Sequence, residues 1–275
     1  MRFVRYGEPG SEKPGVLDAS DQLRDLSGVV ADLSGDVLAN LPDVDPETLP
    51  MVVGNPRLGT PVAGVGKFIA IGLNYFDHAA EVGAKPPAEP IVFMKATSAI
   101  SGPFDAVSLP RGSQKSDWEV ELGVVIGKPA KYVDTANALD HVAGYTIVND
   151  VSERAFQTER GGQWTKGKSC DTFGPIGPWL VTPDDVPDPQ ALALSLDVNG
   201  TRMQTGNTSS MIFGVAHVIA YLSQMMSLQS GDVICTGTPP GVGMGMKPPR
   251  FLREGDEMTL EISGLGRQTQ RVVRD

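Results

Sequence analysis

The sequence predicts a β-rich α+β fold for this chain of 275 residues. Apolar residues make up 40% of the chain and charged residues 20%, a mixture that is typical of a globular protein. The 32 glycines and 22 prolines favour many turns between short strands. Several short segments have the apolar pattern of strands, whereas one segment has convincing helical periodicity.

The N-terminal part is expected to form a small α/β domain, residues 1–62. Its predicted elements are strands at 3–6 and near 15–17, a turn at 18–21 and a weakly periodic helix at 26–41. Five prolines between positions 42 and 61 then indicate a connector, because proline interrupts regular structure. The larger domain is therefore placed at residues 63–275.

Strand patterns dominate this larger domain. The predicted strands are 68–73, 91–94, 118–126, 145–148, 192–198, 232–236 and 258–262. Apolar residues alternate along 118–126, so one face of that strand is apolar and the other carries Glu119 and Glu121. Asn199-Gly200 follows another alternating segment, and this dipeptide favours a two-residue hairpin.

Helices are expected at few places. Apolar residues recur at intervals of three and four over 215–226, which predicts a helix that packs on a sheet. A shorter helix is predicted at 134–142 with Asp134 as its cap, and Ser152 is expected to cap a short turn through Gln157.

The charge balance argues against nucleic acid and membranes as partners. The chain has 33 acidic and 23 basic side chains, a net charge of -10, which repels phosphate backbones and anionic lipids. No segment has the length of a signal peptide core or a membrane span. Cys170 and Cys235 form no disulfide or zinc pattern. We therefore expect a cytoplasmic protein.

Two glutamates are candidate metal ligands. Glu119 and Glu121 point to the same side of a strand, where two carboxylates repel each other unless a positive charge lies between them. A hard divalent cation would offset this repulsion, and Asp150, at the end of another predicted strand, could supply a third carboxylate. From spacing alone, a solvated polar face is the commoner explanation.

Two further groups are candidates for catalysis. His78 and Glu81 are three residues apart in a segment that tolerates a helix, so the carboxylate could orient the imidazole as a general base. Lys168 could stabilise developing negative charge on a substrate oxygen. The alternatives are a chance surface pair and an ordinary surface lysine.

Five segments in this order resemble the fumarylacetoacetate hydrolase family. They extend over most of the larger domain: Gly72-Leu73-Asn74-Tyr75-Phe76-Asp77-His78-Ala79-Ala80-Glu81, Asp117-Trp118-Glu119-Val120-Glu121-Leu122, Asn149-Asp150-Val151-Ser152, Lys166-Gly167-Lys168-Ser169-Cys170-Asp171-Thr172-Phe173-Gly174-Pro175 and Thr236-Gly237-Thr238-Pro239-Pro240-Gly241-Val242-Gly243. Each segment alone is a weak signal, but five in register are strong.

The resemblance implies a mixed β-roll catalytic domain that forms a homodimer or a higher homo-oligomer. It implies Mg²⁺ or Mn²⁺ held by Glu119, Glu121 and Asp150, with His78 and Glu81 on a lid that activates water and Lys168 as the active-site lysine. The positions that match substrate contacts are Arg154, Gln157 and Thr238. Relatives usually carry Ala-Arg-Asp between positions 152 and 157, where this chain has Glu153-Arg154-Ala155.

The implied activity is metal-dependent hydrolysis of the C3–C4 bond of a 2,4-diketo acid to pyruvate and a second acid. The N-terminal residues Arg5-Tyr6-Gly7 and Lys13-Pro14-Gly15 look like those of members that act on 2,4-diketo-3-deoxy sugar acids, such as those derived from L-fuconate or L-rhamnonate. Ureidoglycolate lyase, acylpyruvate hydrolase and oxaloacetate-type decarboxylase are alternatives within the family. A binding protein without catalysis would need neither His78 nor Glu81.

Overall fold

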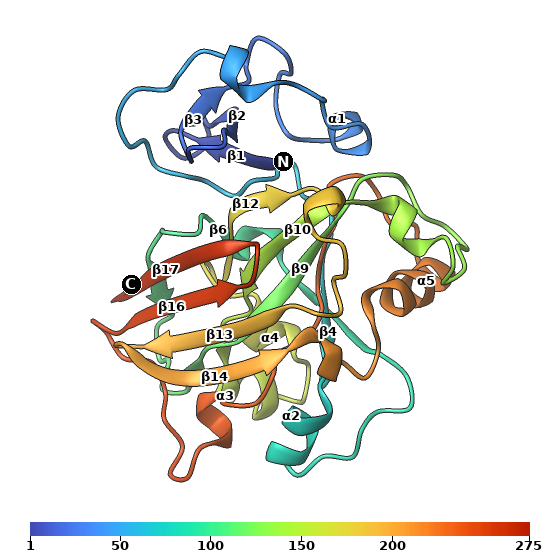
Figure 1. The fold of residues 1–275 in the computed structure, drawn as a ribbon. Coiled ribbons are helices and arrows are strands. Elements are labelled where there is room, and N and C mark those ends of the chain that lie inside the picture. Colours follow the sequence, from blue (N-terminus) through green and yellow to red (C-terminus); the bar gives the residue numbers. More distant parts are fainter.

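The computed structural model describes all residues, 1–275. Figure 1 shows that the first strands and their loops lie at one end of a larger body made mainly of strands. Two sheets in this body pack against each other, and the helices lie around them. The predicted β-rich α+β class is therefore confirmed.

Ten strands form the larger sheet. In spatial order they are β3 (Leu23–Asp25), β2 (Lys13–Leu17), β1 (Arg2–Tyr6), β12 (Gly174–Val181), β10 (Val142–Asn149), β9 (Val120–Ile126), β15 (Val233–Cys235), β4 (Phe68–Gly72) and β5 (Ile91–Lys95), while β6 (Ile100–Ser101) pairs with β12 off this path. Neighbours run antiparallel except for the parallel pairs β15–β4 and β12–β6.

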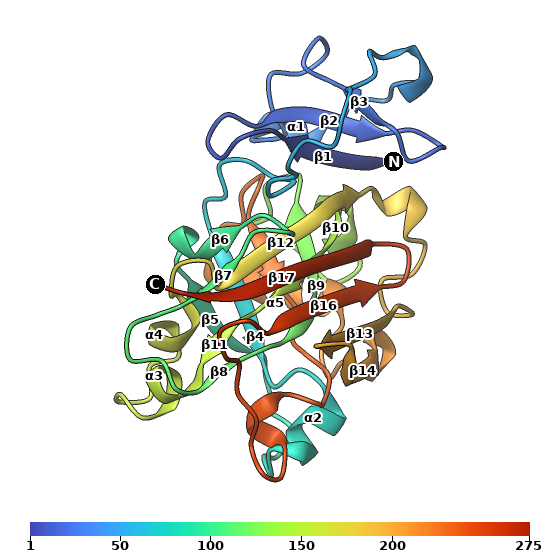
Figure 2. The same ribbon diagram turned by 90° about the vertical axis from the view of Figure 1, so that its left-hand side faces the viewer.

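A second sheet covers one face of the larger one. Its five strands are β14 (Thr201–Asn207), β13 (Ala193–Val198), β16 (Glu257–Ile262), β17 (Gly266–Arg274) and β7 (Val107–Leu109), and a separate short ladder pairs β8 (Ser116–Asp117) with β11 (Ser152–Glu153). Figure 2 shows β16 and β17 in front of the strands of the larger sheet. This arrangement makes β9 and β10 central strands.

The core lies on both faces of the larger sheet. Between the two sheets, Leu122 of β9 packs in the same apolar cluster as Leu260 of β16. On the opposite face, Val125 of β9 belongs to a second cluster with Leu33 and Leu38 from the N-terminal part. Every residue of β9 is buried, so a solvated polar face on this strand is ruled out.

The α-helices are short apart from one. They are α1 (Asp36–Ala39), α2 (Phe76–Glu81), α3 (Arg154–Thr158), α4 (Thr165–Lys168) and α5 (Val215–Met225). The last of these confirms the periodic segment, because Val218, Ile219 and Leu222 are buried in the core. Figure 1 shows α2 and α3 toward the end of the body remote from the N-terminal part, with α4 nearer the middle. None of the helices has the length and apolar character needed to cross a bilayer.

The predicted hairpin is confirmed. β13 and β14 pair antiparallel on either side of Asn199 and Gly200, whose φ angles are 52° and 72°. Positive φ at both turn residues is the conformation that the Asn-Gly dipeptide favours.

The helix predicted over 26–41 is wrong, because only Asp36–Ala39 is helical. The Asp32 side chain accepts a hydrogen bond from the N–H of Leu33 (2.8 Å), and such local bonds compete with helix formation. Leu33 and Leu38 are nevertheless buried, so this part of the chain packs on the sheet without forming the longer helix.

The helix predicted at 134–142 is also wrong. The Asp134 side chain accepts a hydrogen bond from the N–H of Asn137 (3.0 Å), which closes a turn, and only a 3₁₀ segment, Ala138–His141, follows. A short polar side chain that accepts a hydrogen bond from a nearby backbone N–H stabilises a turn in place of a longer helix.

The cap predicted at Ser152 is one residue out of place. Glu153 caps α3, because its side chain accepts a hydrogen bond from the N–H of Ala155 (3.1 Å). The Ser152 hydroxyl instead donates to the carbonyl oxygen of Asp150 (3.1 Å). The turn itself therefore forms where it was expected.

Two long strands escaped the sequence analysis. β12 contains Pro175 and Pro178, and proline is rare inside strands, so its sequence does not indicate a strand. β17 turns Gln268 and Gln270 inward, so its alternation does not separate apolar from polar residues. The Gln270 amide donates to the carbonyl oxygen of Pro103 (2.6 Å), which satisfies this buried group.

The division into residues 1–62 and 63–275 stays a prediction. The N-terminal part looks distinct in Figure 1, yet β1 pairs antiparallel with β12 through Arg2 with Val181 and Phe3 with Leu180. The N-terminal part therefore extends the sheet of the body.

We expect Leu122→Ala to lower the free energy of unfolding by about 2–5 kcal/mol, since it opens a cavity between the two sheets. Denaturant unfolding would measure the change. Val53→Ala is the control, because Val53 is 87% exposed and should change stability little. Equal effects of the two substitutions would contradict the assigned core.

Candidate active site

Three buried carboxylates meet where β9 begins and β10 ends. Glu121 lies in β9, Glu119 precedes that strand, and Asp150 follows β10. The strands pair antiparallel with Val148 opposite Glu121, which brings these positions together. One oxygen of each carboxylate lies within 4.8 Å of the others. The structure thus brings together the three residues predicted as metal ligands.

Three basic side chains surround these carboxylates. Lys168 Nζ lies 2.5 Å from an oxygen of Glu119 and 2.6 Å from an oxygen of Asp150. Lys95 Nζ lies 2.5 Å from the other Asp150 oxygen, and Arg154 Nη2 lies 2.6 Å from the other Glu119 oxygen. Burial alone would raise the pKa of Glu119, but the charges of Arg154 and Lys168 outweigh burial and lower it.

Glu121 differs from the other two because no basic side chain pairs with it. Its Oε2 accepts a hydrogen bond from the N–H of Gly237 (2.7 Å). Burial, together with the charges of Asp150 and Glu119, raises the pKa of Glu121 well above its usual range. Negative charge is therefore least compensated at this side chain.

The three residues fit a hard divalent cation. Carboxylate oxygen is the ligand type that Mg²⁺ and Mn²⁺ prefer, and the donor set contains nothing else. A cation between the three oxygens would also offset the charge at Glu121. Glu119, Glu121 and Asp150 are the residues that would hold it, while Lys95 and Lys168 fix the orientation of Asp150.

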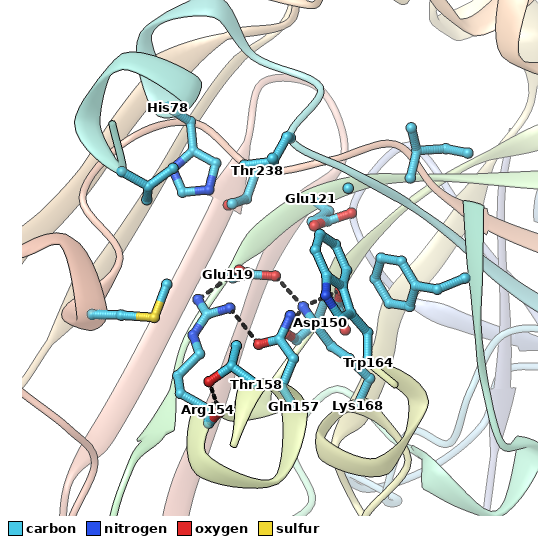
Figure 3. Close-up of a pocket in the computed structure, with 16 residues that line it drawn as sticks. His78, Glu119, Glu121, Asp150, Arg154, Gln157, Thr158, Trp164, Lys168 and Thr238 are labelled. Atoms are coloured by element: carbon cyan, nitrogen blue, oxygen red, sulfur yellow. Dashed lines mark hydrogen bonds and ion pairs between the residues drawn. The ribbon is translucent and has the colours of Figure 1, made fainter. Parts of the chain in front are cut away.

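These carboxylates line a cavity of about 100 Å³. Eight of the nine predicted site residues line it, and Glu81 lies outside. Figure 3 shows His78 and Thr238 on the side opposite Arg154, Gln157 and Lys168, with the carboxylates between them.

His78 and Glu81 form the predicted pair on α2. Nδ1 of His78 lies 2.9 Å from Oε2 of Glu81, and His78 is 6% exposed. Oε1 of Glu81 accepts a hydrogen bond from the N–H of Gly241 (2.8 Å), which fixes the carboxylate. If Nδ1 carries the proton that Glu81 accepts, Nε2 is left as a proton acceptor. Figure 3 shows the imidazole directed into the cavity.

The three predicted substrate-contact residues also lie at the cavity. Arg154 Nη1 donates to the Gln157 amide oxygen (3.1 Å), so these two side chains support each other. The Thr238 hydroxyl donates to the carbonyl oxygen of Val120 (2.9 Å) and accepts from the Gln204 amide (2.7 Å). All three side chains are held in fixed orientations.

Two buried charged residues at the site, Lys95 and Asp117, were not predicted from the sequence. Lys95 ends β5, and the ion pair that it makes with Asp150 spans 55 positions of the chain. Asp117 accepts hydrogen bonds from Arg154 Nε (2.9 Å) and from the N–H groups of Gly243 (2.7 Å) and Met244 (3.0 Å). Asp117 could have been predicted from its position two residues before Glu119, because residues i and i+2 of an extended chain point to the same side.

A comparison with protein families identifies the chain. The family model described as "Fumarylacetoacetate (FAA) hydrolase C-terminal" matches residues 67–273. The chain belongs to the fumarylacetoacetate hydrolase family. The resemblance of the five segments and the fold expected from them are thereby confirmed, and the protein is an enzyme of this family.

Relatives and solved structures of the fumarylacetoacetate hydrolase family resemble the whole chain. A provisionally named hydrolase of Burkholderia multivorans is 63% identical over 98% of both chains. The fumarylacetoacetate hydrolase of Exiguobacterium antarcticum is 36% identical, with a TM-score of 0.91 over 100% of both chains. A maleylpyruvate hydrolase of Sphingobium, solved with manganese and pyruvate, is 30% identical, with a TM-score of 0.80 over 100% of this chain and 99% of that one.

In this family member we expect Asp117→Asn to lower the free energy of unfolding by about 3–5 kcal/mol, because one oxygen that accepts from Arg154 and Met244 becomes an amide donor. Denaturant unfolding measures the loss. Asp184→Asn is the matched control, since Asp184 is exposed. If Asp117→Asn and Asp184→Asn change the free energy of unfolding equally, Asp117 does not anchor the site.

Proposed function

We propose that the protein hydrolyses the C3–C4 bond of a 2,4-diketo acid with Mg²⁺ or Mn²⁺, giving pyruvate and a second acid. The observation that carries the proposal is the position of His78, held by Glu81, across one cavity from three clustered carboxylates. A protein that only binds a metal or a sugar acid has no need of such a pair.

The proposed metal ligands are Glu119, Glu121 and Asp150. A divalent cation held there supplies positive charge that stabilises negative charge on the 2-oxo group of the substrate. Two observations support this assignment. All donors are carboxylate oxygens, and the similar maleylpyruvate hydrolase structure contains manganese together with pyruvate.

His78 is the proposed general base. Its Nε2 takes a proton from water, and the water oxygen attacks the C4 carbonyl carbon. The C3–C4 bond then breaks, its electron pair stays on the three-carbon fragment, and that fragment takes up a proton at C3. One water molecule is consumed, and pyruvate and a carboxylic acid are released.

The basic and polar residues would position the substrate. The Lys168 ammonium group lies among the carboxylates, where it can stabilise negative charge on the oxygen of the departing three-carbon fragment. Arg154, Gln157 and Thr238 line the same cavity and would orient substrate oxygens. In this proposal Lys168 stabilises negative charge, whereas Arg154, Gln157 and Thr238 orient the substrate.

The finer proposal for the substrate is a 2,4-diketo-3-deoxy sugar acid, such as 2,4-diketo-3-deoxy-L-rhamnonate or -L-fuconate. Its support is the likeness of the N-terminal residues Arg5-Tyr6-Gly7 and Lys13-Pro14-Gly15 to members with such substrates. The second product would then be an acid such as lactate.

An acylpyruvate hydrolase is the second candidate. It is favoured by the structural likeness to a maleylpyruvate hydrolase that was solved with pyruvate. Ureidoglycolate lyase and oxaloacetate-type decarboxylase are the remaining alternatives within the family. A homodimer or a higher homo-oligomer and a cytoplasmic location stay predictions.

A substrate panel tests the proposed reaction. Purified protein with Mg²⁺ or Mn²⁺ is assayed with 2,4-diketo sugar acids, acylpyruvates, ureidoglycolate and oxaloacetate, while pyruvate and glyoxylate are followed. Pyruvate together with one equivalent of a second acid, formed only with metal, is the expected result. Glyoxylate from ureidoglycolate, or carbon dioxide from oxaloacetate, with no diketo acid cleaved, would overturn the proposal.

We expect Glu121→Gln to weaken Mn²⁺ binding by at least about tenfold. Glu121 has no basic partner, so the neutral isostere leaves no buried cation unpaired and the fold should survive. Titration calorimetry measures the affinity, and circular dichroism checks the fold. Glu8→Gln, at an exposed position, is the control. Unchanged Mn²⁺ affinity in a folded Glu121→Gln variant would remove Glu121 from the ligand set.

We expect His78→Ala to keep Mn²⁺ affinity and to lower kcat by about 10²–10⁴-fold, because the variant has no group to take the proton from water. His141→Ala serves as the comparison, since this histidine lies outside the cavity. Steady-state kinetics with the best panel substrate give kcat. Wild-type kcat in the His78 variant would mean that another residue activates water.

A further inference from the structure

We infer that the substrate carries a single carboxylate and that its distal end, the part beyond C4, is uncharged. This inference rests on the proposed function and names the class of its substrate more closely. Two properties of the cavity support it: the pairing of its basic groups and the apolar character of its remaining surface.

Both basic side chains that line the cavity already face carboxylates. Arg154 lies between Asp117 and Glu119, at 2.9 Å and 2.6 Å, and Lys168 lies between Glu119 and Asp150. Each cation therefore has two anionic partners at the end of the cavity where the metal ligands lie. No other lysine or arginine lines the cavity to receive a second substrate carboxylate.

The rest of the lining is mainly apolar. It consists of Ile71, Leu73, Val82, Phe93, Trp164 and Met244, together with Gly72 and Thr158. The Thr158 hydroxyl already donates to the carbonyl oxygen of Arg154 (2.9 Å). A substrate tail in contact with these side chains loses water and gains no ionic partner, which disfavours a carboxylate and favours a methyl or other uncharged group.

Trp164 is a fixed part of this surface. A Cβ atom at Gly72 would lie 2.4 Å from a carbon of the Trp164 ring, so the indole packs directly on the backbone of β4. The ring also contacts Phe93 edge to face, with the ring centres 5.4 Å apart. These two contacts hold the indole against β4 and β5.

Two unreactive 2-oxo acids test the inference. 2-Oxopentanoate and 2-oxoglutarate share the 2-oxo acid group and differ at the distal end, which is a methyl group in the first and a carboxylate in the second. Neither has a carbonyl group at C4, so neither can undergo the proposed cleavage. Titration calorimetry with the Mg²⁺-loaded full chain should show at least tenfold tighter binding of 2-oxopentanoate.

The outcomes separate this inference from the proposed function. If 2-oxoglutarate binds as tightly as 2-oxopentanoate or more tightly, the inference fails while the 2-oxo acid site stands. If neither compound binds in the presence of Mg²⁺, the proposed 2-oxo acid site fails, and the inference fails with it.

A substitution that introduces a positive charge into the lining provides a second test. Met244→Lys places a positive charge in the apolar lining at a partly exposed position, 37% exposed in the natural chain. The preference for 2-oxopentanoate over 2-oxoglutarate should fall at least fivefold, while Met244→Gln, of similar size and uncharged, should keep it. An unchanged preference in a folded Met244→Lys variant would show that this apolar lining does not face the distal end, and the inference would be overturned.

Discussion

The need to neutralise three buried carboxylates organises this structure. Burying an ionised carboxylate is unfavourable unless it is paired, and here the basic partners of Glu119 and Asp150 come from distant parts of the chain. Lys95 ends β5, Arg154 begins α3 and Lys168 ends α4. The ion pairs therefore hold β5, α3 and α4 to Glu119, which precedes β9, or to Asp150, which follows β10.

The two sheets provide the rigid support that this charge cluster requires. Asn149 connects them, because its amide donates to Gln270 of β17 (3.0 Å) and its carbonyl oxygen accepts from the N–H of Glu119 (3.3 Å). Gln204 of β14 makes a similar connection, since its carbonyl oxygen accepts from the N–H of Val120 (2.9 Å). Hydrogen bonds of these buried amides thus connect the second sheet to the backbone at Glu119 and Val120.

Apolar runs and alternation of apolar and polar residues predicted many of the strands, and strands without either pattern were missed. Alternation identified the hairpin strands, whereas inward-facing Gln268 and Gln270 concealed β17. For the site, the spacing of Glu119 and Glu121 predicted adjacent carboxylates, and the place of Asp150 at the end of another predicted strand made it a candidate third ligand, which the family resemblance then assigned. The role of Lys95 depends on a contact across 55 positions, which no local pattern encodes.

The carboxylate of Glu81 makes two contacts at once, one with the imidazole and one with the backbone of Gly241. Any outward displacement of α2 must break the hydrogen bond to Gly241, and the same displacement withdraws His78. The contact with Gly241 therefore couples the position of α2 to the alignment of the imidazole.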